Sequence, residues 1–317
     1  MMSILQYLLY AVLGMAGLYY GAEFLVKGGV SIARRAGVSP LVIGLTLVAF
    51  ATSAPELVVS ISAAIDGSGD ISLGNVVGSN ICNIALILGI CACITPMKVQ
   101  RQILRFDAWF MLGSAVLLTL FYFSAHGINR LQAGVFLLCM IGYVIWSVIA
   151  SRKESTAGGA QGAAEKLLPL RQAFLLIILA LALLIGGAKV FLASAVFFAQ
   201  KLGISEAVIG LTIVAVGTSL PELATSAVAA IKGENDIAIG NVVGSNIFNI
   251  LGILGIAPLI APLKNTTIDP VDMGTMVLFS LLLVPMMRTG WKISRKEGAV
   301  LLTGYAAYIA YLLCTHT

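Results

Sequence analysis

Long apolar runs dominate the chain, and short polar gaps separate them. Runs of about 20 apolar residues recur along the sequence, and each is long enough to cross the hydrocarbon core of a bilayer as a helix. The runs are continuous and lack the period-two alternation of membrane β-strands, so the predicted spans are helical. The pattern predicts ten spans, at 4–26, 40–65, 71–95, 106–125, 131–150, 172–197, 206–231, 237–260, 272–288 and 297–314.

One longer hydrophilic stretch, 151–171, interrupts this pattern in the middle of the chain. It is rich in glycine, alanine and charged residues and reads as a flexible cytoplasmic linker that is too short to hold a domain. The stretch divides the chain into an N-terminal unit of five spans, 1–150, and a C-terminal unit of five spans, 172–317.

The two units repeat one another. Residues 37–90 align with residues 203–256 at a constant offset of 166 without a gap, and 35 of these 54 positions are identical. Weaker likeness at the same offset pairs Gly21 with Gly187, so the first span corresponds to the sixth and is not a cleaved signal peptide. Because each unit has an odd number of spans, equivalent helices should cross the bilayer in opposite directions, as in the inverted repeats of secondary transporters.

The distribution of basic residues supports this topology. With the N-terminus outside, the inner loops hold fifteen lysines and arginines, and the outer loops hold three: Arg130, Lys201 and Lys264. This is a strong positive-inside bias. The predicted fold is therefore an all-α membrane protein with ten transmembrane helices, arranged as two inverted-topology repeats of five, and with both termini outside.

Composition excludes several other classes of protein. The chain is 59% hydrophobic and 10% charged, with a mean hydropathy of +1.02, whereas a soluble domain carries about 25% charged residues. The net charge of +5 lies in the gaps between spans and does not indicate nucleic-acid binding. The five cysteines form no CxxC and the chain has two histidines, so a zinc or iron–sulfur site is not expected.

Polar residues cluster at two places inside the apolar spans of each repeat. The first is a Thr-Ser-x-Pro-Glu element, at 52–56 and 218–222. The second is a Gly-Asn-Val-Val-Gly-Ser-Asn-Ile-x-Asn element, at 74–83 and 240–249. Hydroxyl, amide and carboxylate groups at such depth predict a polar site within the membrane.

The glutamates of the first element, Glu56 and Glu222, are the strongest candidates. A carboxylate at mid-bilayer costs about 2.5–3.5 kcal/mol, and this cost at two equivalent positions indicates that the groups meet. Each adjacent proline removes a backbone hydrogen bond and leaves a carbonyl oxygen available. Hard oxygen donors with two negative charges suit Ca²⁺, and the same oxygens can hold Na⁺ instead.

Other polar residues admit simpler interpretations. A serine or threonine in a membrane helix often bonds its own backbone, and Gly74 and Gly240 are expected to serve helix packing. Glu23 and Lys189 occupy equivalent positions with opposite charge and are expected near span ends or snorkelling to the interface. Asp107 follows a basic loop and is expected at the interface.

The doubled motifs resemble those of the sodium/calcium exchanger family, within the cation/calcium exchanger superfamily. The likeness is greatest to compact prokaryotic members, because a large cytoplasmic regulatory insert is absent at 151–171. The resemblance implies that Ca²⁺ exchanges for Na⁺ by alternating access, with the first and sixth spans sliding over an eight-helix core. It assigns ion ligation to carboxylates, hydroxyls, amides and two backbone carbonyls: Glu56, Thr52, Ser53, Ser79, Asn83, Ala49, Glu222, Thr218, Ser219, Ser245, Asn249 and Ala215.

Two positions bear on the coupled ion. Some relatives carry aspartate where this chain has Asn249, so the site keeps two formal negative charges and a case for potassium dependence is weaker. Proton-coupled calcium exchangers usually place an acidic residue after their Gly-Asn pair, whereas Asn75 is followed here by Val-Val-Gly-Ser, which favours sodium. A proton/calcium antiporter is the alternative, ahead of a cation channel and a non-transporting scaffold.

The remaining expectations follow from the same interpretation. The chain is not expected to be an enzyme or to need a cofactor. Its substrates would be Ca²⁺ and Na⁺, and its surroundings the lipid bilayer, with no nucleic acid and no obligatory protein partner. The expected location is a prokaryotic plasma (inner) membrane.

Overall fold

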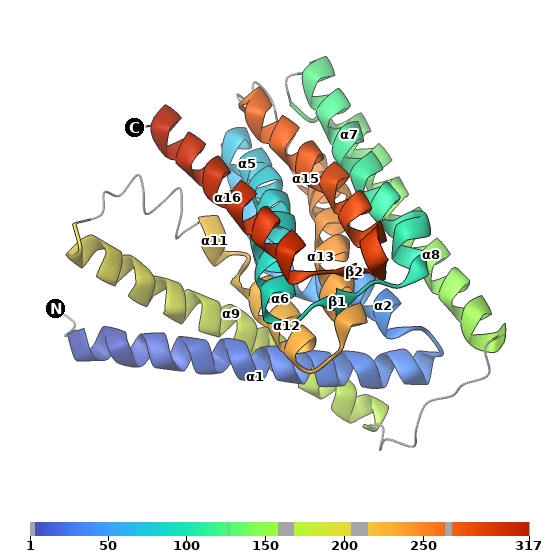
Figure 1. Ribbon diagram of the computed structural model, residues 1–317. Helices are drawn as coiled ribbons and strands as arrows, with labels where there is room; N and C mark the ends of the chain where they lie inside the picture. The colour runs from blue at the N-terminus through green and yellow to red at the C-terminus, as the bar shows by residue number, and fades with distance from the viewer. Residues whose placement is uncertain (1–3, 126, 158–167, 204–214, 264–267, 317) are drawn as a thin grey trace.

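The computed structural model describes residues 4–125, 127–157, 168–203, 215–263 and 268–316, and almost all of them are helical (Figure 1). Eight helices of this part are long and apolar enough to cross a membrane, and a bent pair of helices makes a ninth. The predicted seventh span, 206–231, lies partly outside the described residues. From Ala215 onward it is helical, and the other nine spans coincide with the predicted ones apart from their ends.

The bounds of the elements are as follows. The first half contains α1 (Ile4–Ala36), α2 (Pro40–Ile43), η1 (Gly44–Val48), α3 (Ala49–Thr52), α4 (Ala54–Ile65), α5 (Gly69–Ile81), η2 (Cys82–Leu88), α6 (Gly89–Ile94), β1 (Met97–Lys98), η3 (Ile103–Asp107), α7 (Ala108–Ala125) and α8 (Arg130–Ala157). The second half contains α9 (Leu170–Lys201), α11 (Ala215–Gly217), α12 (Leu220–Ile231), α13 (Asn235–Ile247), η5 (Phe248–Ile253), α14 (Leu254–Ile260), α15 (Pro270–Arg288), η6 (Thr289–Trp291), β2 (Lys292–Ile293) and α16 (Arg295–His316).

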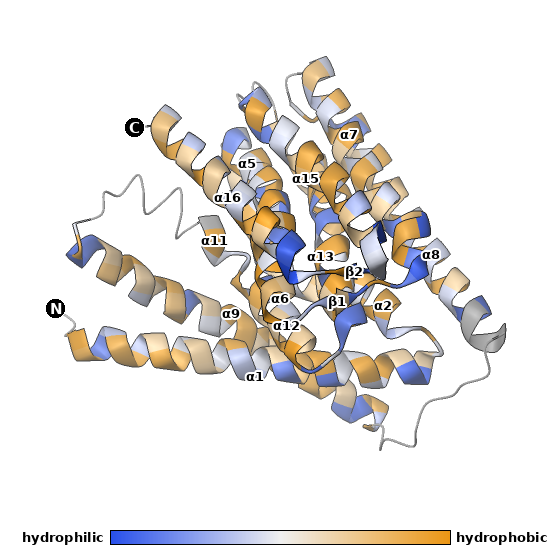
Figure 2. Cartoon of the chain, in the orientation of Figure 1, coloured by the Kyte–Doolittle hydropathy of each residue, from blue (hydrophilic) through white to orange (hydrophobic). Residues whose placement is uncertain are grey.

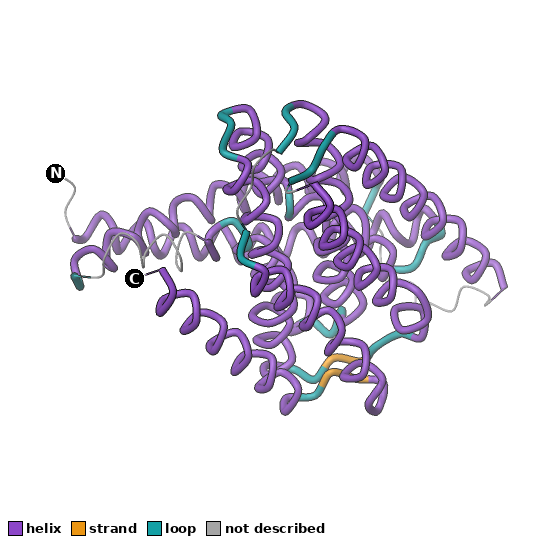
Figure 3. The backbone as a smooth tube through the Cα atoms, turned by 90° about the horizontal axis from the view of Figure 1, so that it is seen from above, coloured by secondary structure: helices purple, strands orange, loops and turns teal. Residues whose placement is uncertain are grey.

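The helices α1 and α9 are longer than predicted and lie side by side, crossing the rest of the bundle obliquely (Figures 1 and 3). The polar, glycine-rich sequence after residue 26 does not end α1, which continues to Ala36. Small residues explain the close packing: a Cβ atom on Gly17 would lie 3.1 Å from the backbone of Gly187. The linker is correspondingly shorter than 151–171, because α8 runs to Ala157 and α9 begins at Leu170.

Two short strands qualify the all-α prediction. Strand β1 pairs antiparallel with β2, with Met97 opposite Ile293. An isolated bridge joins Ile128 to Leu263. Each contact joins a loop of one half of the chain to a loop of the other, so extended backbone satisfies its hydrogen bonds where the helices end.

The helices that carry the repeated motifs are interrupted. The helical pair Pro40–Thr52 and Ala54–Ile65 bends by 48° at the intervening Ser53. Pro55 and Pro221 stand in the first turns of α4 and α12, where a missing amide hydrogen costs little. The π-helical turns η2 and η5 interrupt the following spans at equivalent places, and such turns are frequent at functional sites.

Polarity is distributed as in a membrane protein. Large apolar side chains such as Leu5 and Leu138 are 75% and 71% exposed on the outer helices, and hydrophilic residues gather near helix ends and loops (Figure 2). In contrast, the centre of the bundle buries serines, threonines, asparagines and both motif glutamates. Buried polar groups at the centre and apolar groups at the periphery suit a lipid environment.

Candidate ion-binding site

The two motif glutamates occupy equivalent helical positions. Glu56 lies in the first turn of α4 and Glu222 lies in the first turn of α12. The first backbone amides of a helix have no intrahelical partner, and the positive end of the helix dipole stabilises negative charge there. The side chains are 1% and 0% exposed, so both carboxylates are held away from solvent at the start of a helix.

Each carboxylate accepts a hydrogen bond from a serine of the other repeat. The Ser53 hydroxyl donates to Glu222 Oε1 at 2.7 Å, and the Ser219 hydroxyl donates to Glu56 Oε1 at 3.1 Å. Both serines stand at the N-cap of their own helix but do not cap it. The second oxygen of each glutamate, Oε2, is buried and has no hydrogen-bond partner. Each carboxylate thus keeps one oxygen for a ligand.

Two asparagines that were not predicted as site residues fix the backbone at the glutamates. The Asn75 amide donates to the Glu56 carbonyl at 3.2 Å and to a serine hydroxyl of α4 at 2.9 Å. The equivalent Asn241 donates to the Glu222 carbonyl at 3.4 Å and to a serine hydroxyl of α12 at 3.0 Å. The signal was present in the sequence, since both asparagines belong to the repeated element, but their role appears only once the helices are packed.

Further contacts between the repeats involve amide groups. Thr52 donates to Asn241 Oδ1 at 3.0 Å, and Asn83 donates to Asn246 Oδ1 at 3.1 Å. These contacts join residues of the two repeats that are more than 160 positions apart in the sequence. Together with the serine–glutamate bonds, they bring the repeated elements of both halves to one place.

Several predicted site residues have buried polar atoms without a partner. Asn249 is fully buried, and neither its amide nitrogen nor its oxygen makes a hydrogen bond. The same holds for the hydroxyl oxygens of Thr218 and Ser245 and for the Asn83 carbonyl oxygen. Ser79 is also buried. Buried polar atoms without a partner are unfavourable and indicate a missing ligand. The atoms are mostly oxygens, which suits hard cations.

The two predicted alanine carbonyls differ from one another. The Ala49 carbonyl accepts the Ser53 amide at 3.0 Å and the Thr52 hydroxyl at 3.3 Å. In the second repeat the Ser219 amide bonds to Val216 rather than to Ala215. An ion would therefore compete with protein donors for the Ala49 oxygen in this conformation.

No basic side chain of the described residues forms an ion pair with either motif glutamate, and no group of three or more histidines, cysteines and acidic residues occurs there. A buried carboxylate without a counter-charge is costly and must be neutralised by a bound ion or a proton. The arrangement can bind cations and release them, because nothing in the described chain neutralises it permanently.

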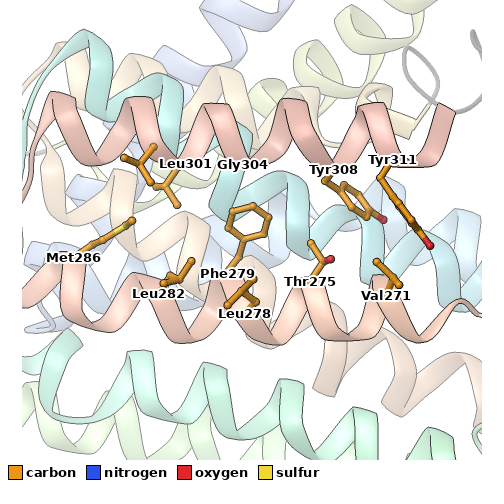
Figure 4. A pocket seen from close by; sticks show the side chains of 11 residues that line it. Val271, Thr275, Leu278, Phe279, Leu282, Met286, Leu301, Gly304, Tyr308 and Tyr311 are labelled. Atoms are coloured by element: carbon orange, nitrogen blue, oxygen red, sulfur yellow. The ribbon is translucent and has the colours of Figure 1, made fainter. Parts of the chain in front are cut away.

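The most prominent hollow of the described surface is elsewhere. A groove of about 270 Å³ separates α15 from α16, and its walls are mostly apolar side chains with Tyr308 and Tyr311 at one end (Figure 4). None of the predicted ion-site residues lines it. The buried glutamates are identified by their chemistry rather than by an open cavity.

The prediction for Asp107 was wrong. Its side chain is fully buried instead of interfacial, and the Tyr143 hydroxyl donates to its Oδ1 at 3.0 Å. The π-helical turn η3 carries Asp107 beneath α7 and away from the basic loop. Tyr143 could not be recognised as its partner from sequence, because it lies on the next span.

Comparison with known proteins decides the family. The sequence profile of the family described as sodium/calcium exchanger protein matches residues 6–149 and 172–314. The chain belongs to the sodium/calcium exchanger family. It is accordingly a membrane antiporter and not an enzyme, and the substrates of the family are Na⁺ and Ca²⁺.

Individual relatives cover nearly the whole exchanger. The sodium/calcium exchanger MaX1 of Methanosarcina acetivorans is 38% identical, over 95% of this chain and 96% of its own length. The inner membrane protein YrbG of Escherichia coli is 35% identical, over 95% of both chains. A solved structure of the sodium-calcium exchanger NCX_Mj, soaked with zero Na⁺ and Ca²⁺, superimposes with a TM-score of 0.84 at 34% identity and covers 98% of this chain and 100% of that one.

Proposed function

We propose that this exchanger moves Ca²⁺ against Na⁺ by alternating access, and that Glu56 and Glu222 bind both ions. The observation that carries the proposal is the reciprocal bonding at the centre of the bundle. Ser53 bonds Glu222 and Ser219 bonds Glu56, while one oxygen of each carboxylate remains without a partner. Two half-occupied carboxylates form a site for a divalent cation or for several monovalent ones.

The surrounding donors complete the proposed site. Hydroxyl and amide oxygens of the predicted set lie in the same repeated elements, and several have no protein partner. Ca²⁺ takes six to eight oxygen ligands in flexible geometry. The proposed ligands are Glu56, Thr52, Ser53, Ser79, Asn83, Ala49, Glu222, Thr218, Ser219, Ser245, Asn249 and Ala215.

We further propose ten spans in two inverted repeats, 1–150 and 172–317. Contacts recur with exchanged partners at an offset of 165 or 166 residues. Tyr143 donates to Asp107 at 3.0 Å, and Tyr308 donates to Asp272 at 2.9 Å.

The loop contacts follow the same symmetry. Met97 pairs with Ile293, and Leu263, the equivalent of Met97, pairs with Ile128. The two loop pairings lie toward opposite ends of the helices (Figure 1). That arrangement is expected of halves that cross the membrane in opposite directions.

Coupling follows from the charge of the site. With two buried carboxylates and no basic partner, the empty site would carry its charge through the membrane at high cost. Either Ca²⁺ or a set of Na⁺ ions removes that cost, so the loaded forms cross and the empty form does not. The positive-inside bias places both termini outside, in a prokaryotic inner membrane.

Flux measurements on reconstituted vesicles test the function. An outward Na⁺ gradient should drive Ca²⁺ into vesicles, and an imposed pH gradient of equal size should not. Uptake driven by the pH gradient alone would instead establish the proton/calcium antiporter. Trans-Ca²⁺ should accelerate the entry of labelled Ca²⁺, and a lack of such saturable counterflow would indicate a channel.

A further inference from the structure

An ion pair joins α1 to the motif-bearing half-helix of the second repeat. Lys232, which follows the last residue of α12, lies 2.7 Å from Glu23 of α1. The side chains are 37% and 31% exposed, so the pair sits at the surface of the bundle. Glu23 is one of few charged residues on α1, and its interpretation as a snorkelling side chain leaves this partner unexplained.

The repeat offset maps this pair onto another pair of opposite charges. Adding 166 to Glu23 gives Lys189 of α9, and subtracting 166 from Lys232 gives Asp66, which follows α4. Both signs are inverted, so attraction is preserved: acid on α1 with base after α12, and base on α9 with acid after α4. Neither Lys189 nor Asp66 forms an ion pair with a residue that the structure describes, and both are exposed.

The packing of the same helices is asymmetric in the same sense. Helix α1 packs extensively along α12, whereas the equivalent helices α9 and α4 scarcely touch. Helices α1 and α9 are joined to each other through glycine contacts, with the Cβ of a residue at Gly21 reaching within 3.0 Å of the Ala180 carbonyl oxygen. They can therefore move over the core only as one unit. Such a movement would separate α1 from the end of α12 and bring α9 to the end of α4.

We propose that Glu23–Lys232 and Lys189–Asp66 are alternating ion pairs that stabilise opposite access states of the exchanger. This inference rests on the proposed alternating access. In the proposed topology Lys232 lies at the inner end of α12 and Asp66 at the outer end of α4. The observed pair closes the inner face while the outer face is open. The second pair forms when the α1–α9 unit has moved and the outer face is closed.

The proposal predicts opposite effects of equivalent substitutions. Glu23→Gln and Lys232→Gln remove the pair of the outward-facing state, so the ratio of half-saturating Ca²⁺ on the outer face to that on the inner face should rise about two- to five-fold, as for a partly exposed ion pair. Asp66→Asn and Lys189→Gln should lower this ratio by a similar factor. Lys27→Gln, which removes an exposed charge one turn along α1, is the matched control and should leave it unchanged.

The measurement uses Ca²⁺ uptake by right-side-out and by inverted membrane vesicles. The double variant E23Q/K232Q should match either single one, and the exchanged pair E23K/K232E should restore the wild-type ratio. A shift in the same direction from all four substitutions, or an equal shift from K27Q, would overturn the proposal.

Hydrogen–deuterium exchange separates this proposal from the proposed function, because it needs no sodium-driven flux. In the absence of ions, E23Q should lower protection at the end of α12 and raise it at the end of α4, and D66N should do neither. If wild-type protein shows no sodium-driven uptake but exchange responds as described, the paired states stand and the coupled ion is wrong. Unchanged protection in E23Q contradicts the ion-pair proposal itself.

Discussion

The Ser53 hydroxyl donates a 2.7 Å hydrogen bond to Glu222, although the two residues lie 169 positions apart in the chain. The residue that interrupts one helix thus holds the carboxylate of the other repeat. Its counterpart, from Ser219 to Glu56, is 3.1 Å long. The site is therefore shared between the halves, and neither half contains a complete set of ligands.

Removing either serine hydroxyl should weaken ion binding. A hydrogen bond to a charged group contributes about 1.5–3 kcal/mol, so Ser53→Ala and Ser219→Ala should each raise the half-saturating Ca²⁺ concentration by about ten-fold or more. Ser53→Thr retains the hydroxyl and should lie closer to wild type. Ser62→Ala, on the exposed side of α4, is the control, and an equal effect there would show that the loss is not specific to the carboxylate contact.

Asn249 should separate ion binding from stability. Neither of its side-chain polar atoms has a protein partner, so Asn249→Leu removes no internal hydrogen bond and should not lower the melting temperature of the ion-free protein. The stabilisation that Ca²⁺ adds should shrink, because a ligand stabilises only the form that binds it.

Asn246→Leu is the contrasting variant at the neighbouring position. Asn246 accepts from Asn83 at 3.1 Å and donates to Met111 at 3.6 Å. Its loss should lower the melting temperature without ions, by about 1–3 kcal/mol of unfolding free energy. A large loss for Asn249→Leu and none for Asn246→Leu would reverse the assignment of roles.

Gly244 should tolerate no side chain. A Cβ atom there would lie 2.5 Å from the Leu45 carbonyl oxygen, because α13 and η1 approach through their backbones. Gly244→Ala should therefore destabilise the fold by about 1–3 kcal/mol or more, measured by thermal unfolding in detergent. Gly113→Ala on an exposed face of α7 should be neutral or slightly stabilising. Equal melting temperatures for both variants would argue against the close helix contact.

The tyrosine–aspartate pairs should differ in their contribution to stability. Tyr143→Phe leaves the fully buried Asp107 without its hydrogen-bond donor, which should cost about 1–3 kcal/mol. Tyr308→Phe removes the equivalent bond to Asp272, a partly exposed carboxylate that water can reach, and should cost less. Thermal unfolding of the two variants compares them directly, and a larger loss for Tyr308→Phe would contradict this account of their burial.

Much of the fold could be predicted from hydrophobic periodicity. Continuous apolar runs locate the spans because lipid permits few alternatives to a helix. The ends were less predictable: α1 continues to Ala36 through a glycine-rich stretch because that stretch packs against α9. The prolines correctly indicated where α4 and α12 begin, since a helix restarts readily at a proline in its first turn.

The site was partly predictable for a similar reason. Glu56 and Glu222 stand out because a carboxylate inside an apolar span has a cost. Which serine bonds which glutamate, and that Asn241 supports Glu222, depends on contacts between helices that are distant in sequence. The burial of Asp107 was missed because its partner Tyr143 lies on the next span.

Sodium-driven uptake of labelled Ca²⁺ by Glu56→Gln and Glu222→Gln variants in reconstituted vesicles tests the central claim most directly. Glutamine keeps the size of the side chain and removes its charge, so each variant should fold and neither should take up Ca²⁺ above background. Glu297→Gln makes the same change at the start of α16, outside the site, and should transport normally. Normal uptake by either folded site variant would contradict the account.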